Sequence, residues 1–154
     1  MTTPTMDAHT EAKLNLTMAV AIGAVVQGAL ALLPVLDLRV IGSIERHVRT
    51  AYPDWGSADV NADTTAIVIG MVIVGIVGVA GWLVALIAAR RRGSARRTVT
   101  ILFVVGMTVL AVVAGLGGAE YDQIVPLWMG ATTLAVSAVT GATAVLAAWW
   151  RTPR

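Results

Sequence analysis

The apolar residues of this chain are concentrated in four long runs separated by short polar segments. The runs cover residues 14–36, 65–89, 98–116 and 124–150. Because a helix rises about 1.5 Å per residue, each run is long enough to cross a hydrocarbon core of about 30 Å, with the third near the lower limit. The pattern predicts an all-α integral membrane protein, built as a four-transmembrane-helix bundle.

The polar segments predict what surrounds these helices. Residues 1–13 show no apolar periodicity and are expected to form a disordered tail. Within residues 37–64, apolar positions recur at helical spacing from Val40 to Trp55. This stripe predicts a short amphipathic helix that either lies in the membrane interface or folds over the end of the bundle. Loops are expected at residues 56–63, 90–97 and 117–123, with residues 151–154 as the C-terminal end.

Charge is segregated by segment, which predicts the orientation. The connector between the second and third runs is strongly basic, whereas residues 37–64 and 117–123 are net acidic. Basic connectors stay on the cytoplasmic side, so we expect a plasma-membrane protein with both termini in the cytoplasm. The basic residues of the connector are Arg90, Arg91, Arg92, Arg96 and Arg97. The position of the connector on the cytoplasmic side is enough to explain this arginine cluster. At that position the arginines would also contact anionic lipid headgroups. No aromatic residues lie between these arginines and no nucleic-acid-binding fold is indicated, so we expect no binding of nucleic acid.

Aromatic residues near the ends of the runs agree with this orientation, because Trp and Tyr favour membrane interfaces. The expected outer anchors are Tyr52, Trp55 and Trp128, and the inner anchors are Trp149 and Trp150.

The composition indicates that lipid surrounds most of the chain, and it excludes several kinds of catalytic and redox chemistry. Hydrophobic residues make up 57% of the chain and charged residues 13%, about half the usual charged share. The chain has no cysteine, which excludes disulfides and thiolate chemistry. Lys13 is the single lysine among eleven basic residues, which is typical of a GC-rich bacterial gene.

Two groups of polar residues inside the runs are candidate sites. Gln27 lies well within the first run, where an unpaired amide would be costly. Thr133, Ser137 and Thr140 share one face of the fourth run. Together they indicate either a polar pocket for a ligand or simple interhelical packing, in which hydroxyls bond to neighbouring helices or backbone.

No run contains an ionisable side chain, which argues against proton-coupled transport and intramembrane hydrolysis. The acids that begin at Asp59 resemble the start of a calcium loop, but the glycine and the final glutamate of such a loop are missing. His9 and His47 have no second ligand at metal spacing. We therefore expect no catalytic residue, metal or cofactor.

The leading hypothesis is a non-enzymatic accessory or scaffolding subunit. It would pack against other membrane helices, in a homo-oligomer or with a partner membrane protein, through small-residue stripes such as Gly70, Gly78 and Gly81. The alternative is a small transporter or lipid-binding protein with a cavity around Gln27 and the hydroxyl face of the fourth run. A third hypothesis, an enzyme acting on interfacial lipid, requires the outer carboxylates to converge.

Overall fold

The computed structural model describes residues 8–91 and 95–150, which are helical apart from short connections. The long helices are α1 (Ala8–Leu36), α3 (Ser57–Arg90), α4 (Ala95–Gly115) and α5 (Leu127–Trp149). A π-helical turn, η1 (Asp37–Ile41), and the short helix α2 (Ser43–Ala51) join α1 to α3. The described chain is all-helical, as predicted, and contains four helices long and apolar enough to cross a membrane.

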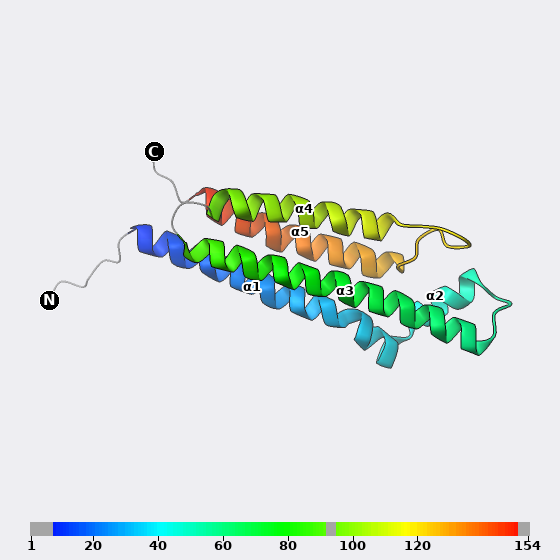
Figure 1. Cartoon of the computed structure of the whole chain (residues 1–154). Helices are drawn as coiled ribbons and strands as arrows, with labels where there is room; N and C mark the ends of the chain where they lie inside the picture. The colour runs from blue at the N-terminus through cyan, green and yellow to red at the C-terminus, as the bar shows by residue number, and fades with distance from the viewer. Residues whose placement is uncertain (1–7, 92–94, 151–154) are drawn as a thin grey trace.

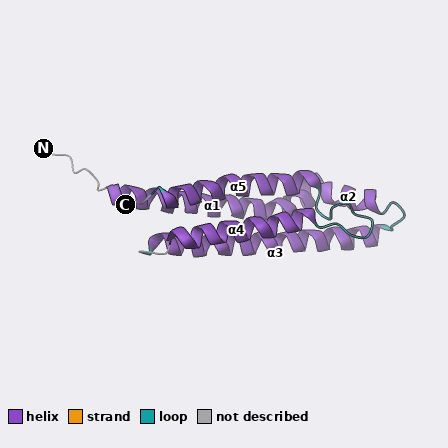
Figure 2. Ribbon diagram, turned by 90° about the horizontal axis from the view of Figure 1, so that it is seen from above, coloured by secondary structure: helices purple, strands orange, loops and turns teal. Residues whose placement is uncertain are grey.

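The four long helices run up and down side by side (Figures 1 and 2). α1 packs against α3 and α5, and α4 packs against α5 and α3, which closes a four-membered ring. The start of α1, the end of α3, the start of α4 and the end of α5 lie at one end of the bundle. α2 and the α4–α5 connection lie at the other. We call these the arginine end and the capped end.

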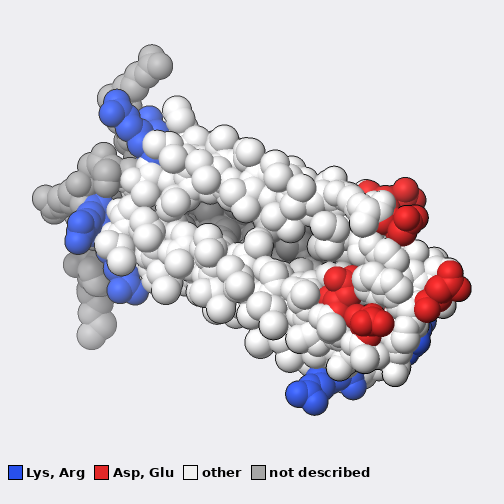
Figure 3. Space-filling view, turned by 45° about the vertical axis from the view of Figure 1, so that its right-hand side comes forward, with Lys and Arg blue, Asp and Glu red and all other residues white. Residues whose placement is uncertain are grey.

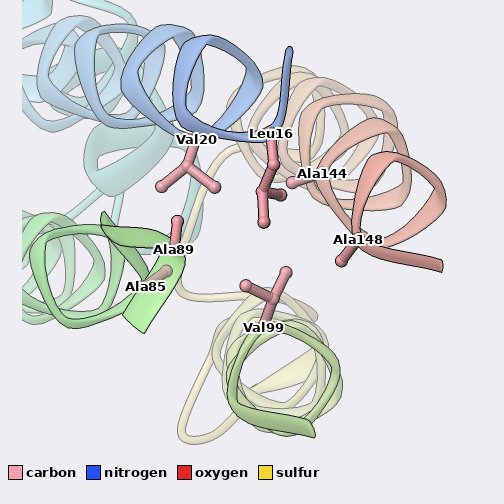
Figure 4. Packing of buried hydrophobic residues seen from close by; sticks show 7 residues of the cluster. All are labelled: Leu16, Val20, Ala85, Ala89, Val99, Ala144 and Ala148. Carbon is pink, nitrogen blue, oxygen red and sulfur yellow. The ribbon is translucent and has the colours of Figure 1, made fainter. Parts of the chain in front are cut away.

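Two apolar clusters hold the bundle together, one near each end. Figure 4 shows the first, in which small and branched side chains from all four helices point to a common centre. Its buried members are Leu16, Val20, Ala85, Ala89, Val99, Ala144 and Ala148. The second cluster lies under α2 and comprises Ile44, Val48, Val60, Ile67, Val68, Val125 and Met129. Alanines in the first cluster bring the backbones close, as is typical of membrane helix packing.

α2 folds over the capped end of the bundle, which decides between the two placements predicted for it. Its apolar residues Ile44 and Val48 are fully buried against α3 and the start of α5. The helix is shorter than the predicted stripe, because Gly42 adopts a left-handed conformation (φ 67°) and ends η1 before α2 begins. Val40, at the start of that stripe, is left 80% exposed.

Two predicted boundaries were wrong. Residues 8–13 belong to α1 rather than to a disordered tail, since extending an existing helix costs far less than starting one. Residues 57–63, expected as an acidic loop, form the first turns of α3. Asp59 lies in the first turn, where the helix dipole favours a negative charge. Residues 1–7 and the end at 151–154 lie outside the described residues.

Candidate functional site

Gln27 lies in the middle of α1 and points into the bundle, where it is only 5% exposed. A glycine on α3 makes room for it, because a Cβ added at Gly78 would lie 2.8 Å from Gln27 Nε2. From α5, Ser137 Oγ donates a hydrogen bond of 3.4 Å to Gln27 Oε1. The structure therefore brings together two of the four residues predicted as a polar site.

The other two predicted residues do not join this pair. The Thr140 hydroxyl donates to the backbone carbonyl oxygens of Val136 and Ser137, within its own helix. Thr133 lines a separate cavity of about 40 Å³, nearer the capped end, that also touches Gln27. Local backbone bonding is the ordinary role of a threonine hydroxyl in a membrane helix. Of the four predicted residues, Gln27 and Ser137 are the two that hydrogen-bond between helices.

A larger cavity of about 190 Å³ lies beside the Gln27–Ser137 pair, and we call it the α3–α4 cleft. Its walls come mainly from α3 and α4, while α5 and Gln27 of α1 form its floor. The lining is largely apolar: Val74, Val77, Gly78, Gly81, Trp82, Ala85, Val99, Leu102, Phe103, Val105, Gly106, Met107, Val109, Leu110, Gly141 and Ala144, with Gln27 and Ser137. Since the two polar side chains bond to each other, the cleft offers a nearly hydrocarbon surface.

The α3–α4 cleft opens sideways, through the uncharged face of the bundle. Val77, Val105 and Val109 line it and are 63%, 54% and 44% exposed, so they form its rim. Figure 3 shows the hollow on the white face between the charged ends of the molecule. In a membrane, such an opening faces lipid chains rather than water.

Two glycines, which have no side chain, keep the cleft open. Gly81 of α3 and Gly106 of α4 both line it, and a Cβ added at either would meet nothing within 4 Å. α4 itself is shallowly packed, and Val99 is its one buried residue. By contrast, α4 sits closely on α5, where the Phe103 ring occupies the space over Gly141.

The capped end carries polar contacts that sequence reasoning missed. Asp37 is fully buried, and its carboxylate accepts hydrogen bonds from Ser43 N (3.1 Å), Ile44 N (2.9 Å) and Ser43 Oγ. It therefore caps the start of α2 from six residues upstream. No local cue distinguished Asp37 from an ordinary loop acid, because the cap depends on how η1 turns the chain.

A second contact joins α3 to the α4–α5 connection. The Tyr121 hydroxyl donates to Asp63 Oδ2. Burial, reinforced by this hydrogen bond and the negative charge of Asp63, raises the pKa of Tyr121 well above its ordinary value. His47 bonds through Nε2 to the carbonyl oxygen of Gln123 at 2.6 Å and stacks on Tyr121. These contacts fasten α2 and the connection over the bundle.

The outer carboxylates are spread among separate structural contacts. Glu45 pairs with Arg49, Asp37 caps α2, and Asp63 accepts from Tyr121. Within residues 8–91 and 95–150, no group of three His, Cys, Asp or Glu side chains is arranged to hold a metal ion.

The predicted interface anchors lie near the two ends. Trp55 stacks on Tyr52, and Trp128 Nε1 donates to Ser43 Oγ at 3.2 Å, both at the capped end. At the arginine end, Trp149 Nε1 donates to Thr100 Oγ1 at 3.3 Å, and Trp150 is exposed.

The arginine end presents a basic rim. Arg90, Arg91 and Arg97 are exposed, and the guanidinium of Arg96 lies 4.6 Å from the centre of the Trp149 ring. Arg92 lies outside the described residues. Every Asp and Glu whose side chain the structure describes lies at the capped end, which Figure 3 shows in red.

Fold and site together define a helical bundle with four helices long and apolar enough to span a membrane and with a lateral apolar cleft. The chain matches no protein-family model, no curated protein and no solved structure.

Proposed function

We propose that this chain is a non-enzymatic, multi-pass protein of the plasma membrane that binds one apolar chain of a lipid in the α3–α4 cleft. The cleft itself carries the proposal: about 190 Å³ of nearly apolar space that opens sideways on the uncharged face. Apolar cavities of roughly 150 Å³ stay free of water and accept apolar molecules. A lipid chain is the apolar molecule that surrounds this face at the highest concentration.

The proposed orientation places the arginine end in the cytoplasm. Basic residues near membrane helices favour that side, and the acids whose side chains the structure describes gather at the opposite end. A reporter active only in the cytoplasm, inserted within residues 90–97, should be active. Activity of the same reporter inserted within residues 117–123 instead would reverse the orientation.

Filling the cleft tests lipid binding. In Gly81→Leu, the new side chain occupies the cleft without meeting a neighbouring atom at its Cβ. Gly70→Leu is the matched control, because Gly70 lies on the same helix, also has open space around it and lies outside the cleft lining. We expect native mass spectrometry to find lipid retained by the wild type and Gly70→Leu, and reduced in Gly81→Leu. Equal lipid retention in all three proteins would refute the proposal.

A second candidate function is the accessory or scaffolding subunit. The face of α3 that carries Gly70 favours this function. Ile69 and Ile73 are exposed on it, and the space beside Gly70 is open, so a partner helix could pack closely there. The stripe of small residues on α3 supports partner binding less than the sequence suggested, because Gly78 and Ala85 pack against other helices of the same bundle. A stoichiometric oligomer or complex in mild detergent that is lost in Gly70→Leu, but kept in Gly81→Leu, would favour this function over lipid binding.

A further inference from the structure

The Gln27 amide on the floor of the α3–α4 cleft is only partly used by the protein itself. Its Oε1 accepts the hydrogen bond from Ser137, but in the part of the chain that the structure describes no acceptor receives a hydrogen bond from Nε2. Nε2 lies beside Gly78, which lines the cleft together with Gln27. A buried amide N–H without an acceptor is costly, so an acceptor on a molecule in the cleft would stabilise the complex.

Gln27 lies too deep for the polar part of an ordinary phospholipid. It is thirteen residues after Leu14 and fourteen before Ile41, the ends of this apolar span. At about 1.5 Å per residue, it is about 20 Å from either end. The ester carbonyls of a phospholipid lie at the border of the hydrocarbon core, about 15 Å from its centre. An acyl chain that reaches Gln27 therefore brings only carbon and hydrogen, which leave the amide N–H unpaired.

Two aromatic rings line the cleft near the amide. Trp82 of α3 packs over Gly23, which is one turn before Gln27 in α1. Phe103 of α4 packs over Gly141 of α5, which is one turn after the serine of the polar pair. Because α1 and α5 run in opposite directions, both rings are displaced from the polar pair toward the arginine end. A planar ring bound beside the amide would therefore lie among aromatic side chains, which favour stacked or edge-to-face contact.

The charge and size of the cleft limit its ligand further. None of the residues that line it is ionisable, so the acceptor belongs to an uncharged molecule. A cavity of about 150 Å³ accepts benzene, so about 190 Å³ has room for a six-membered ring with small substituents. The lateral opening at Val77 and Val105 lets an attached hydrocarbon tail continue into the surrounding lipid.

Building on the proposed lipid-binding function, we infer that the lipid bound in the α3–α4 cleft is a prenylated quinone, one of whose ring carbonyls accepts a hydrogen bond from Gln27 Nε2. A quinone is an uncharged planar ring with carbonyl acceptors, and its prenyl tail keeps it within the hydrocarbon core. Surrounding lipid chains offer those carbonyls no donor, whereas the cleft offers one. The ring lies beside Trp82 and Phe103, and the tail leaves through the lateral opening.

The test compares two probes with the same tail. One is trimethyl-geranyl-para-benzoquinone, and the other is trimethyl-geranylbenzene, which lacks the carbonyls. Purified protein in a neutral detergent is titrated with each probe, and the bound probe is counted by native mass spectrometry. Gln27→Met keeps the length of the side chain but removes the amide. The affinity of the quinone relative to the hydrocarbon should be about fivefold lower in Gln27→Met than in the wild type, since a net hydrogen bond is worth about that factor.

Gln123→Met is the matched control, because it makes the same chemical change outside the cleft lining. It should leave the relative affinity of the two probes unchanged, and Gly81→Leu should weaken the binding of both. Circular dichroism and gel filtration establish that each variant is folded.

A measurement on the wild type alone keeps the test independent of the folding of any variant. The infrared carbonyl band of the bound quinone should lie at lower frequency than in a hydrocarbon solvent, because an N–H donor weakens the C=O bond. A bound quinone whose carbonyl band is unshifted would overturn the contact with Gln27.

The outcomes separate this inference from the function on which it rests. Retained phospholipid that is reduced in Gly81→Leu, without binding of the quinone, would overturn the quinone assignment and leave the cleft as a lipid site. A relative affinity of the probes that is unchanged in Gln27→Met would overturn the role of Gln27. Binding of lipid and of both probes that is unchanged in Gly81→Leu would place them outside the cleft and overturn both proposals.

Discussion

A close contact between α1 and α3 gives a quantitative test of the packing of the bundle. Gly75 of α3 faces Ala31 of α1, and a Cβ added at Gly75 would lie 2.6 Å from Ala31 Cβ and 2.9 Å from Ala31 Cα. The second of these is a backbone atom, so no side-chain rotation relieves the clash. Gly75→Ala must therefore push the two helices apart.

The magnitude follows from comparing Gly75→Ala with Gly70→Ala. Both substitutions replace glycine by alanine within α3, so the gain in helix propensity of up to about 1 kcal/mol is common to both. Gly70→Ala adds its methyl group to open space, whereas Gly75→Ala overpacks a filled contact. Overpacking typically costs about 1–3 kcal/mol, so Gly75→Ala should be less stable than Gly70→Ala by about that amount.

Reversible unfolding in mixed micelles, followed by far-ultraviolet circular dichroism as the denaturing detergent is increased, measures this difference. Both variants should have the helix content of the wild type before the transition, and the midpoint of Gly75→Ala should fall well below that of Gly70→Ala. Coincident transitions would show that α1 and α3 are not in close contact at Gly75, and the arrangement of the bundle would have to be revised.

Two further predictions concern the capped end. Asp37→Ala should destabilise the protein by about 2 kcal/mol, since it removes the acceptor for two backbone N–H groups of α2, and Asp37→Asn should recover part of that loss in the same unfolding assay; equal stability of Asp37→Ala and the wild type would refute the cap. The raised pKa of Tyr121 predicts that stability is unaffected by this group below about pH 10 and falls as the pH rises further, because the phenol ionises first in the unfolded chain. Tyr121→Phe should flatten that fall relative to the wild type, and an unchanged slope would contradict the assignment.

The class of the fold was predictable because apolar runs of this length have few stable alternatives. The ends of the helices were not, since hydrophobicity defines only the part that must be covered by lipid. α3 begins at Ser57, eight residues before the predicted start, because its first turns are stabilised by helix propensity and by acids near the N-terminus. Apolar runs therefore set the minimum length of each helix, and local backbone preferences set the rest.

The sequence identified the residues of the polar pair as candidates, but it did not identify which hydroxyl pairs with Gln27. Gln27 stands out in any apolar run, and its partner Ser137 lay on the face singled out for its hydroxyls. Thr140 has the same chemistry as Ser137 but bonds to its own helix. Which hydroxyl meets Gln27 depends on how far α5 is shifted along α1, and no local pattern encodes that shift.

A cavity at Gln27 was one of the alternatives that the sequence offered, but its position between α3 and α4 was beyond prediction, because glycine has two opposite effects in this bundle. Gly75 and Gly141 bring helices together, because Ala31 and the Phe103 ring fill the space over them. Gly81 of α3 and Gly106 of α4 both line the cleft, and no neighbouring side chain fills the space beside them. At these two positions the absence of a side chain therefore leaves a gap between the helices.

α4 shows how these two effects combine to make a site. Among its several contacts with α5 are the points where Phe103 covers Gly141 and where Ala114 packs on Gly130. Those points are about 16 Å apart along α4 at 1.5 Å per residue, and both lie on the side of α4 that faces α5. On the side that faces α3, Gly106 supplies no side chain to bridge the distance. The cleft is thus a consequence of how α4 is fastened, and a larger residue at Gly106 should close it without loosening α4 from α5.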